Sequence, residues 1–292
     1  MKKYGIIALF SASLLAVPVG AQESSFYRVG DYKVYTLTDR SSDGNASVLI
    51  GATPEMLAET MPDGTYPTAV HAFLIKGPEG NILMDAGLGI HIHDQLAALD
   101  VDNNEPLVIK LTHMHGDHIG GLMKEGQKVF SQATLLLSEK EYNYWNSKEE
   151  MNKLPGDKQG GFRMAQTVLE AYAPGLGFET LSPPAPLDID GIYALEAFGH
   201  TPGHTAYLLV SKGEKLLVWG DLAHAMAIQM PYPDVAVTYD VDPAIAITSR
   251  KEILRYVTSE NIPVAGMHIP GTGIGRVEAT GENSYRFIPI GE

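Results

Sequence analysis

The chain of 292 residues contains no cysteine. Disulfide bonds and thiolate ligands are therefore excluded, so any metal site must be built from histidine and carboxylate side chains. Basic residues are also scarce, with 21 Lys and Arg against 35 Asp and Glu, which gives a formal net charge of −14. This balance argues against a nucleic-acid partner, because nucleic acids are bound by a basic face.

A hydrophobic run long enough to span a bilayer is missing as well. The apolar run Ile6–Val17 follows Lys2 and Lys3 and precedes Val19-Gly20-Ala21. A charged start, a short apolar core and a small-x-small site are typical of a secretory signal peptide, with an uncleaved anchor as the alternative. We therefore expect residues 1–21 to be a signal peptide, the mature protein to be periplasmic or secreted, and no membrane contact after cleavage.

What the sequence does contain is a dense cluster of histidines. The apolar run Leu107–Leu111 predicts a buried strand, and His113, His115, Asp117 and His118 follow it directly. Imidazole and carboxylate groups are the ligands that zinc and similar ions prefer. In this spacing His113 and His115 can converge on one ion, while Asp117 and His118 point at a second. Surface histidines are the alternative, but such a cluster seldom arises by chance, and the loop predicts a metal site.

An internal repeat surrounds this loop. The segments Ala72–Asp85 and Ala206–Asp221 each read as a hairpin that ends in aspartate. Each is followed by a helical stretch and then by a strand that ends in a histidine, His113 in the first copy and His268 in the second. Two copies of this pattern predict a duplicated α/β unit with two packed sheets, in which the aspartates and histidines gather at one end.

The remaining organisation is less regular. The Pro-rich connection Leu181–Asp190 is the expected seam between halves of roughly 26–180 and 190–292 within one domain, 22–292. The segment 39–70 is polar and turn-rich, as in a lid, a dimer arm or plain decoration. A homodimer is therefore possible.

Two helix starts stand out in the sequence. Thr53 and Asp242 are expected N-caps, and Pro54 and Pro243 follow them at the first helical positions.

Further candidate ligands lie at strand ends, and here the sequence resembles a known family. The stretches that carry the resemblance are Thr112–His118, Gly199–Thr205, Gly220-Asp221 and Gly266–His268. They are similar to the ordered motifs of the metallo-β-lactamase superfamily. The stretch from Asp221 to the end is similar to the branch of methyl parathion hydrolases and N-acyl-homoserine-lactone lactonases. The resemblance implies an α/β fold, a four-layer αββα sandwich of two pseudo-symmetric halves.

The same resemblance implies two zinc ions and their ligands. The ligands of one ion are His113, His115 and His204, those of the other are Asp117, His118 and His268, and Asp221 bridges the two. Asp85 matches a carboxylate that orients a ligand histidine, with an ordinary strand-end aspartate as the alternative. His200 falls at a supporting position that does not coordinate. His91 and His93 are expected on the surface, and His71 in a strand with its ring satisfied.

The implied chemistry is hydrolysis by a hydroxide that bridges the ions, with Asp117 passing its proton to the leaving group. Many lactonases place a tyrosine three residues after the bridging aspartate, where this chain has His224. His224 either donates a hydrogen bond to the substrate or simply sits in a loop. The apolar side chains of Met226–Tyr232 either line an acyl-binding wall or pack in the core.

These observations predict a small exported hydrolase that opens lactones or cleaves esters. A phosphotriesterase is the alternative. A β-lactam hydrolase is disfavoured by the bridging Asp221, and a non-catalytic binding module by the fully occupied ligand positions.

Overall fold

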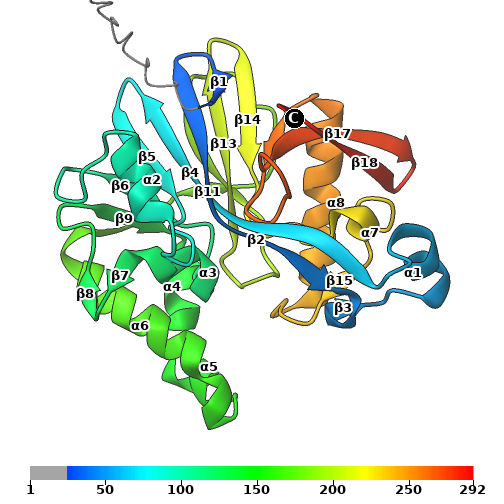
Figure 1. Ribbon diagram of the computed structural model, residues 1–292, viewed down its shortest axis with the longest axis horizontal. Coiled ribbons are helices and arrows are strands. Elements are labelled where there is room, and N and C mark those ends of the chain that lie inside the picture. The colour runs from blue at the N-terminus through cyan, green and yellow to red at the C-terminus, as the bar shows by residue number, and fades with distance from the viewer. Residues whose placement is uncertain (1–24, 292) are drawn as a thin grey trace, which may run out of the picture.

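Two β-sheets that face each other form the centre of the molecule (Figure 1). The computed structural model describes residues 25–291, so the expected signal peptide lies outside the described residues. In spatial order the seven strands of the first sheet are β1 (Tyr27–Val29), β2 (Tyr32–Asn45), β4 (Thr65–Gly77), β5 (Gly80–Met84), β6 (Val108–Lys110), β9 (Thr134–Leu137) and β10 (Leu176–Phe178).

The second sheet also has seven strands. In spatial order they are β11 (Leu181–Ser182), β12 (Gly191–Glu196), β13 (Thr205–Ser211), β14 (Glu214–Val218), β16 (Val264–Ala265), β17 (Ile274–Gly281) and β18 (Ser284–Pro289). The two small ribbons are β3 (Leu49–Ile50) with β15 (Ala236–Val237), and β7 (Met123–Lys124) with β8 (Gln127–Lys128).

Helices cover the outer faces of both sheets. The α-helices are α1 (Pro54–Thr60), α2 (Ile92–Ala98), α3 (Gly116–Ile119), α4 (Glu139–Trp145), α5 (Lys148–Asn152), α6 (Gly160–Tyr172), α7 (Met226–Gln229) and α8 (Pro243–Ser259). Short 3-10 turns are η1 (Ala46–Val48), η2 (Gly120–Leu122), η3 (Gly156–Lys158) and η4 (Ala173–Gly175). Within the described range, no helix is long and apolar enough to cross a membrane.

Three apolar clusters define the layers. Alternate residues of a strand point to opposite faces of its sheet, so Leu74 packs toward α2 and α6, whereas its neighbour Phe73 packs between the sheets. Tyr207 and Leu209 of the second sheet join Phe73 in that central cluster. Leu208, between them, packs toward α8. The order helix, sheet, sheet, helix confirms the predicted αββα sandwich.

The repeated unit occurs in both sheets. In the first, the hairpin β4–β5 is followed by α2 and by β6, which is parallel to β5. In the second, the hairpin β13–β14 is followed by α8 and by β16, which is parallel to β14. Asp85 and Asp221 follow the hairpins, and His113 and His268 follow the parallel strands. This topology brings the ends of both units to the same edge of the sandwich.

Residues 39–70, called the arm below, differ from the expectation of turns. β2 and β4 continue as a paired ladder from Arg40↔Val70 to Asn45↔Thr65, and Figure 1 shows this ribbon extending toward α1. The polar side chains of β2 do not alternate with apolar ones here, so the strand depends on its pairing rather than on a hydrophobic face. The tip then pairs with the second half through β3 and β15.

Both predicted helix starts are confirmed. The Thr53 hydroxyl accepts the Met56 N–H at 3.3 Å, and the Asp242 carboxylate accepts the N–H groups of Ala244 and Ile245. These caps satisfy amide groups that have no partner inside the helix.

Candidate metal centre

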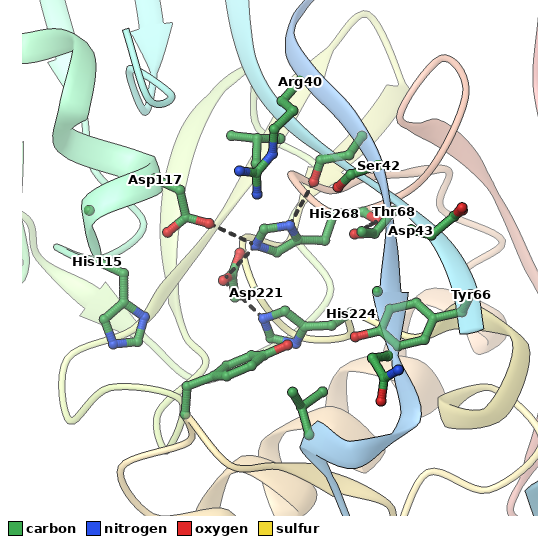
Figure 2. Close-up of a pocket in the computed structure, with 17 residues that line it drawn as sticks. Arg40, Ser42, Asp43, Tyr66, Thr68, His115, Asp117, Asp221, His224 and His268 are labelled. Atoms are coloured by element: carbon green, nitrogen blue, oxygen red, sulfur yellow. Dashed lines mark hydrogen bonds and ion pairs between the residues drawn. The ribbon is translucent and has the colours of Figure 1, made fainter. Parts of the chain in front are cut away.

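Loops at one edge of the sandwich bring the polar residues of both halves together. The loop after β6 carries His113 and His115, the short helix α3 that follows it carries Asp117 and His118, and the loop between β12 and β13 carries His200. Asp221 follows β14 and His268 follows β16. Figure 2 shows His115, Asp117, Asp221 and His268 pointing into one cavity.

The first group of donors contains three histidine rings. His115 Nδ1 lies 3.0 Å from His113 Nε2 and 2.9 Å from His200 Nε2. Asp221 Oδ2 lies 3.2 Å from His200 Nε2 and 3.6 Å from His113 Nε2. Burial holds the pKa of His113 and of His115 well below the usual histidine value. The neutral rings of His113 and His115 present lone pairs to the centre. Burial opposes the charge of His200, but its hydrogen bonds to Asp221 and Asp240 raise its pKa to about 9. Three ring nitrogens this close to one another and to a carboxylate suit a shared cation.

The second group lies on the other side of Asp221. His268 Nε2 is 3.0 Å from Asp221 Oδ2 and 3.5 Å from Asp117 Oδ2. His118 Nε2 is 3.2 Å from Asp221 Oδ1. His118 Nε2 and Asp221 Oδ1 are both buried without a hydrogen bond. Buried polar atoms seldom lack a partner, so this pair fits a divalent ion. Burial opposes the charge of Asp221, but His118 and His268 hold its pKa well below the usual range.

His118 and His268 are each held by the nitrogen that faces away from the centre. Asp85 Oδ2 contacts His118 Nδ1 at 2.6 Å and accepts the Thr112 hydroxyl at 2.7 Å. His268 Nδ1 donates to the Ala69 carbonyl at 2.7 Å. Such partners fix which nitrogen faces a metal. The structure thus places Asp85 where the sequence analysis expected a supporting carboxylate.

The assignment of His204 as a ligand needs correction. His204 Nδ1 donates to the Ala197 carbonyl at 2.7 Å, and Nε2 accepts the Asp221 N–H at 2.9 Å, so neither nitrogen is free. Gly220 has a φ of +62°, and a Cβ at this position would lie 2.4 Å from His204 Nε2. His204 is therefore a buried ring that supports the backbone of Asp221.

His200 takes the place that the sequence analysis gave to His204. The group of possible metal-binding residues contains His113, His115, His200 and Asp221. His200 Nδ1 contacts Asp240 Oδ1 at 2.8 Å, which leaves Nε2 toward the other donors. The sequence analysis did not assign Asp240 a site role. Its position just before the N-cap of α8 gave no signal, because the contact forms only in the fold.

Substitution of the two histidines tests this correction. We expect His200→Ala to lose about half of the metal that the unaltered protein binds. The matched variant His204→Gln is expected to keep that metal and to lose mainly stability. Metal analysis and circular dichroism on both variants measure these effects. Loss of metal from His204→Gln with retention in His200→Ala would contradict the structure.

His224 lies at the floor of the cavity, beside the candidate centre. Its Nε2 is 3.1 Å from Asp221 Oδ2, and its ring stacks on that of His268 with centroids 4.7 Å apart. Burial lowers the pKa of His224 to about 4, which keeps the ring neutral. Its backbone N–H donates to Gln229 Oε1, which holds the loop in place.

The predictions for the remaining histidines, His71, His91 and His93, have different outcomes. His71 lies in β4 and its Nε2 donates to the Ile269 carbonyl at 2.8 Å, although Nδ1 has no partner. His91 is exposed and His93 half-buried, and among the described residues neither joins a possible metal-binding group.

The apolar residues beyond Asp221 do not form a wall of the cavity. Met226 and Met230 pack in the core of the second half, whereas Ile228 and Tyr232 pack against the arm. The core interpretation of Met226–Tyr232 is therefore right, and the acyl-binding wall is wrong.

The arm supplies the wall instead. A cavity of about 440 Å³ opens above the candidate centre. Its lining includes three side chains of β2 and β4 that no sequence signal singled out, namely Arg40, Ser42 and Tyr66. Figure 2 shows these residues facing the histidines across the cavity.

Known proteins share these features. A family model described as the metallo-beta-lactamase superfamily matches residues 65–261. The probable metallo-hydrolase YybB of Bacillus subtilis (strain 168) is 30% identical over 155 residues, which are 52% of this chain. The alignment spans only 61% of that relative's length.

Two solved structures are similar over nearly their whole length. One is hydrolase AbOPH of the beta-lactamase superfamily, with a TM-score of 0.81, 27% identity and coverage of 93% of this chain and 99% of that one. The other is AidC, a dizinc quorum-quenching lactonase in complex with its product N-hexanoyl-L-homoserine, with a TM-score of 0.80, 25% identity and coverage of 92% and 97%. The similar proteins are thus metallo-hydrolases, lactonases among them. The match of the family model over most of this chain, together with the αββα fold and the histidine and aspartate groups, shows that the chain belongs to the metallo-beta-lactamase superfamily.

Proposed function

We propose that the protein is an exported dinuclear-zinc hydrolase that opens lactones or cleaves esters. The observation that carries the proposal is the pair of donor groups on either side of Asp221, whose carboxylate lies beside His113 and His200 in one group and beside His118 and His268 in the other. The proposed ligands are His113, His115 and His200 on one side and Asp117, His118 and His268 on the other, with Asp221 between them. When bound, zinc ions supply an acidified water and polarise the substrate carbonyl.

Asp117 is the proposed proton carrier. It lines the cavity, and 29% of its side chain is exposed, so that it can contact both water and substrate. Burial opposes its charge, but His118 and His268 lower the pKa of Asp117, which keeps a carboxylate ready to accept a proton. Asp117 Oδ2 is proposed to take the proton of the attacking water and to deliver it to the leaving alkoxide.

His224 is proposed to orient the substrate. Its ring is neutral and its Nε2 points to the centre beside Asp221, so an N–H here can donate to the substrate carbonyl oxygen. The position three residues after Asp221 would then keep a donor, although the residue is not a tyrosine.

The similarity to AidC supports a lactone as the substrate of this protein, because the AidC structure holds a lactonase product. Phosphotriester hydrolysis is the alternative, and β-lactam hydrolysis or a non-catalytic binding role are further outcomes of the test.

A metal analysis and a substrate panel test the function together. Zinc-loaded protein is expected to carry about two zinc ions per chain and to hydrolyse a lactone or an aryl ester faster than an aryl phosphotriester or a chromogenic cephalosporin. Chelation is expected to abolish the activity and zinc to restore it. Clearly less than one metal per chain after reconstitution, or a phosphotriester as the best substrate, would overturn the proposal.

Export rests on the signal-peptide pattern alone. We propose a periplasmic or secreted mature protein that begins at Gln22. Mass spectrometry of the protein from a periplasmic fraction tests this, since an intact N-terminus would contradict cleavage. A homodimer stays a prediction, for which light scattering is the measurement.

A further inference from the structure

Arg40 is an unusual residue at the edge of the proposed active site. Among the described residues that line the cavity, it is the single lysine or arginine, in a chain with a net charge of −14. Its guanidinium forms no hydrogen bond or ion pair with any described residue. Figure 2 shows it pointing toward the space between Asp117 and His268. An arginine aimed at the centre without a partner offers donors to a ligand.

A β-bulge directs Arg40 into the cavity. The pairing of β2 with β4 changes register between Thr38 and Arg40, so that Asp39 has no partner on β4. A shift of one residue turns every later side chain of a strand to the opposite face. Beyond the bulge, every second cross-strand pair lines the cavity with both of its residues, and these pairs are Arg40↔Val70, Ser42↔Thr68 and Gly44↔Tyr66.

The bulge itself is anchored. The buried Asp39 carboxylate accepts the N–H groups of Gly89 at 2.8 Å and of Ile90 at 3.3 Å, together with that of His91. These contacts fix the backbone next to Arg40, although the Arg40 side chain is exposed. Ser42 lies two residues further on the same face, and a hydroxyl there can join the guanidinium in holding an anion.

The charge of the cavity also favours an anionic ligand. If two divalent ions occupy the centre, they and Arg40 outweigh the carboxylates that line the cavity, which are Asp43, Asp117 and Asp221. The cavity of an acidic protein would then be locally positive and would attract anions.

We propose that Arg40 is a specificity-determining residue that binds a carboxylate carried by the substrate at a distance from the bond that is cleaved. The preferred substrates are then anionic lactones or esters. This inference rests on the proposed hydrolase function. The planar guanidinium matches the two oxygens of a carboxylate, which a neutral group matches less well.

A matched pair of lactones tests the proposal. One is a γ-butyrolactone that bears a carboxylate on the ring carbon β to the carbonyl, and the other bears the neutral carboxamide at the same position. Zinc-loaded protein is expected to favour the carboxylate by at least about tenfold in kcat/KM, mainly through KM, and less so at high salt. Arg40→Met is expected to bring the ratio of the two kcat/KM values close to one, and Arg40→Lys to restore part of it.

Arg286→Met is the matched control, because Arg286 is exposed on β18 and pairs with Glu278. It should keep the ratio of the unaltered protein. If the unaltered protein does not prefer the carboxylate, or if Arg40→Met lowers both rates equally, as it would if Arg40 held only the carboxylate formed by hydrolysis, the proposal is wrong and the hydrolase function stands. If neither this pair nor unsubstituted γ-butyrolactone nor an aryl ester is hydrolysed, the hydrolase function is wrong, and this inference falls with it.

Discussion

Replacement of Asp221 by asparagine is expected to lower kcat/KM by roughly a thousandfold or more and zinc content from about two ions per chain to one or fewer. Asp221 is the carboxylate that both donor groups share. Its Oδ1 faces His118, and its Oδ2 lies 3.0 Å from His268 Nε2. An amide removes the negative charge and presents N–H groups to a site that needs acceptors.

Metal analysis and steady-state kinetics measure both effects. Asp240→Asn is the graded comparison, because Asp240 contacts the centre through His200, and its replacement is expected to lower kcat/KM by about ten- to a hundredfold. Asp234→Asn at an exposed position is the neutral control. Two zinc ions and full activity in Asp221→Asn would refute the shared centre.

Glu141→Ala is expected to lower the free energy of unfolding by about 4 kcal/mol. The Glu141 side chain is fully buried in α4 and accepts four hydrogen bonds. The donors are the N–H of Met114 at 2.9 Å, the Trp145 indole at 2.6 Å, the Thr201 hydroxyl at 2.6 Å and the N–H of Gly203 at 3.0 Å. Alanine leaves all four donors without an acceptor.

The same carboxylate ties together the loops that carry His115 and His200, so Glu141→Ala should also weaken zinc binding. Urea denaturation of the zinc-free and the zinc-loaded protein separates the loss of folding stability from the loss of zinc binding. Added zinc stabilises the folded state of a variant only if that variant still binds zinc. Glu170→Ala on the exposed side of α6 is the matched control, with an expected change within about 0.5 kcal/mol. Equal unfolding curves for Glu141→Ala and Glu170→Ala would show that Glu141 does not stabilise the fold.

The sequence predicts the parts of the fold that have a local signal. The H-x-H-x-D-H loop, the two hairpins that end in Asp85 and Asp221 and the capped start of α8 all lie in contiguous stretches. Their repetition predicts a duplicated unit with two packed sheets, because each copy buries one face of its sheet. The four-layer order is implied by the family resemblance, and the strand order within each sheet is not predicted.

The choice between His200 and His204 has no local signal. Both lie in one loop, and both are buried. Only the Ala197 carbonyl and the Asp221 N–H, which come from separate strand ends, occupy the two nitrogens of His204. The role of Glu141 is hidden for the same reason, since it stands in a polar helical stretch that looks exposed.

The strand structure of the arm could not be predicted from the sequence either. Its strand residues Arg40–Asn45 are polar on both faces and have low strand propensity, so they read as turns. The pairing with β4 stabilises these residues as a strand, although their own side chains do not favour one.

The bulge at Asp39 has a consequence for how this protein diversifies. The arm holds its backbone through the ladder with β4 and through Asp39, while Arg40 and Ser42 face the cavity without ligating the centre. Mutation at these two positions is therefore expected to alter which molecules are accepted and to spare the metal-binding residues. A lineage can acquire new substrates by drifting along one ribbon, with the histidine and aspartate positions held constant.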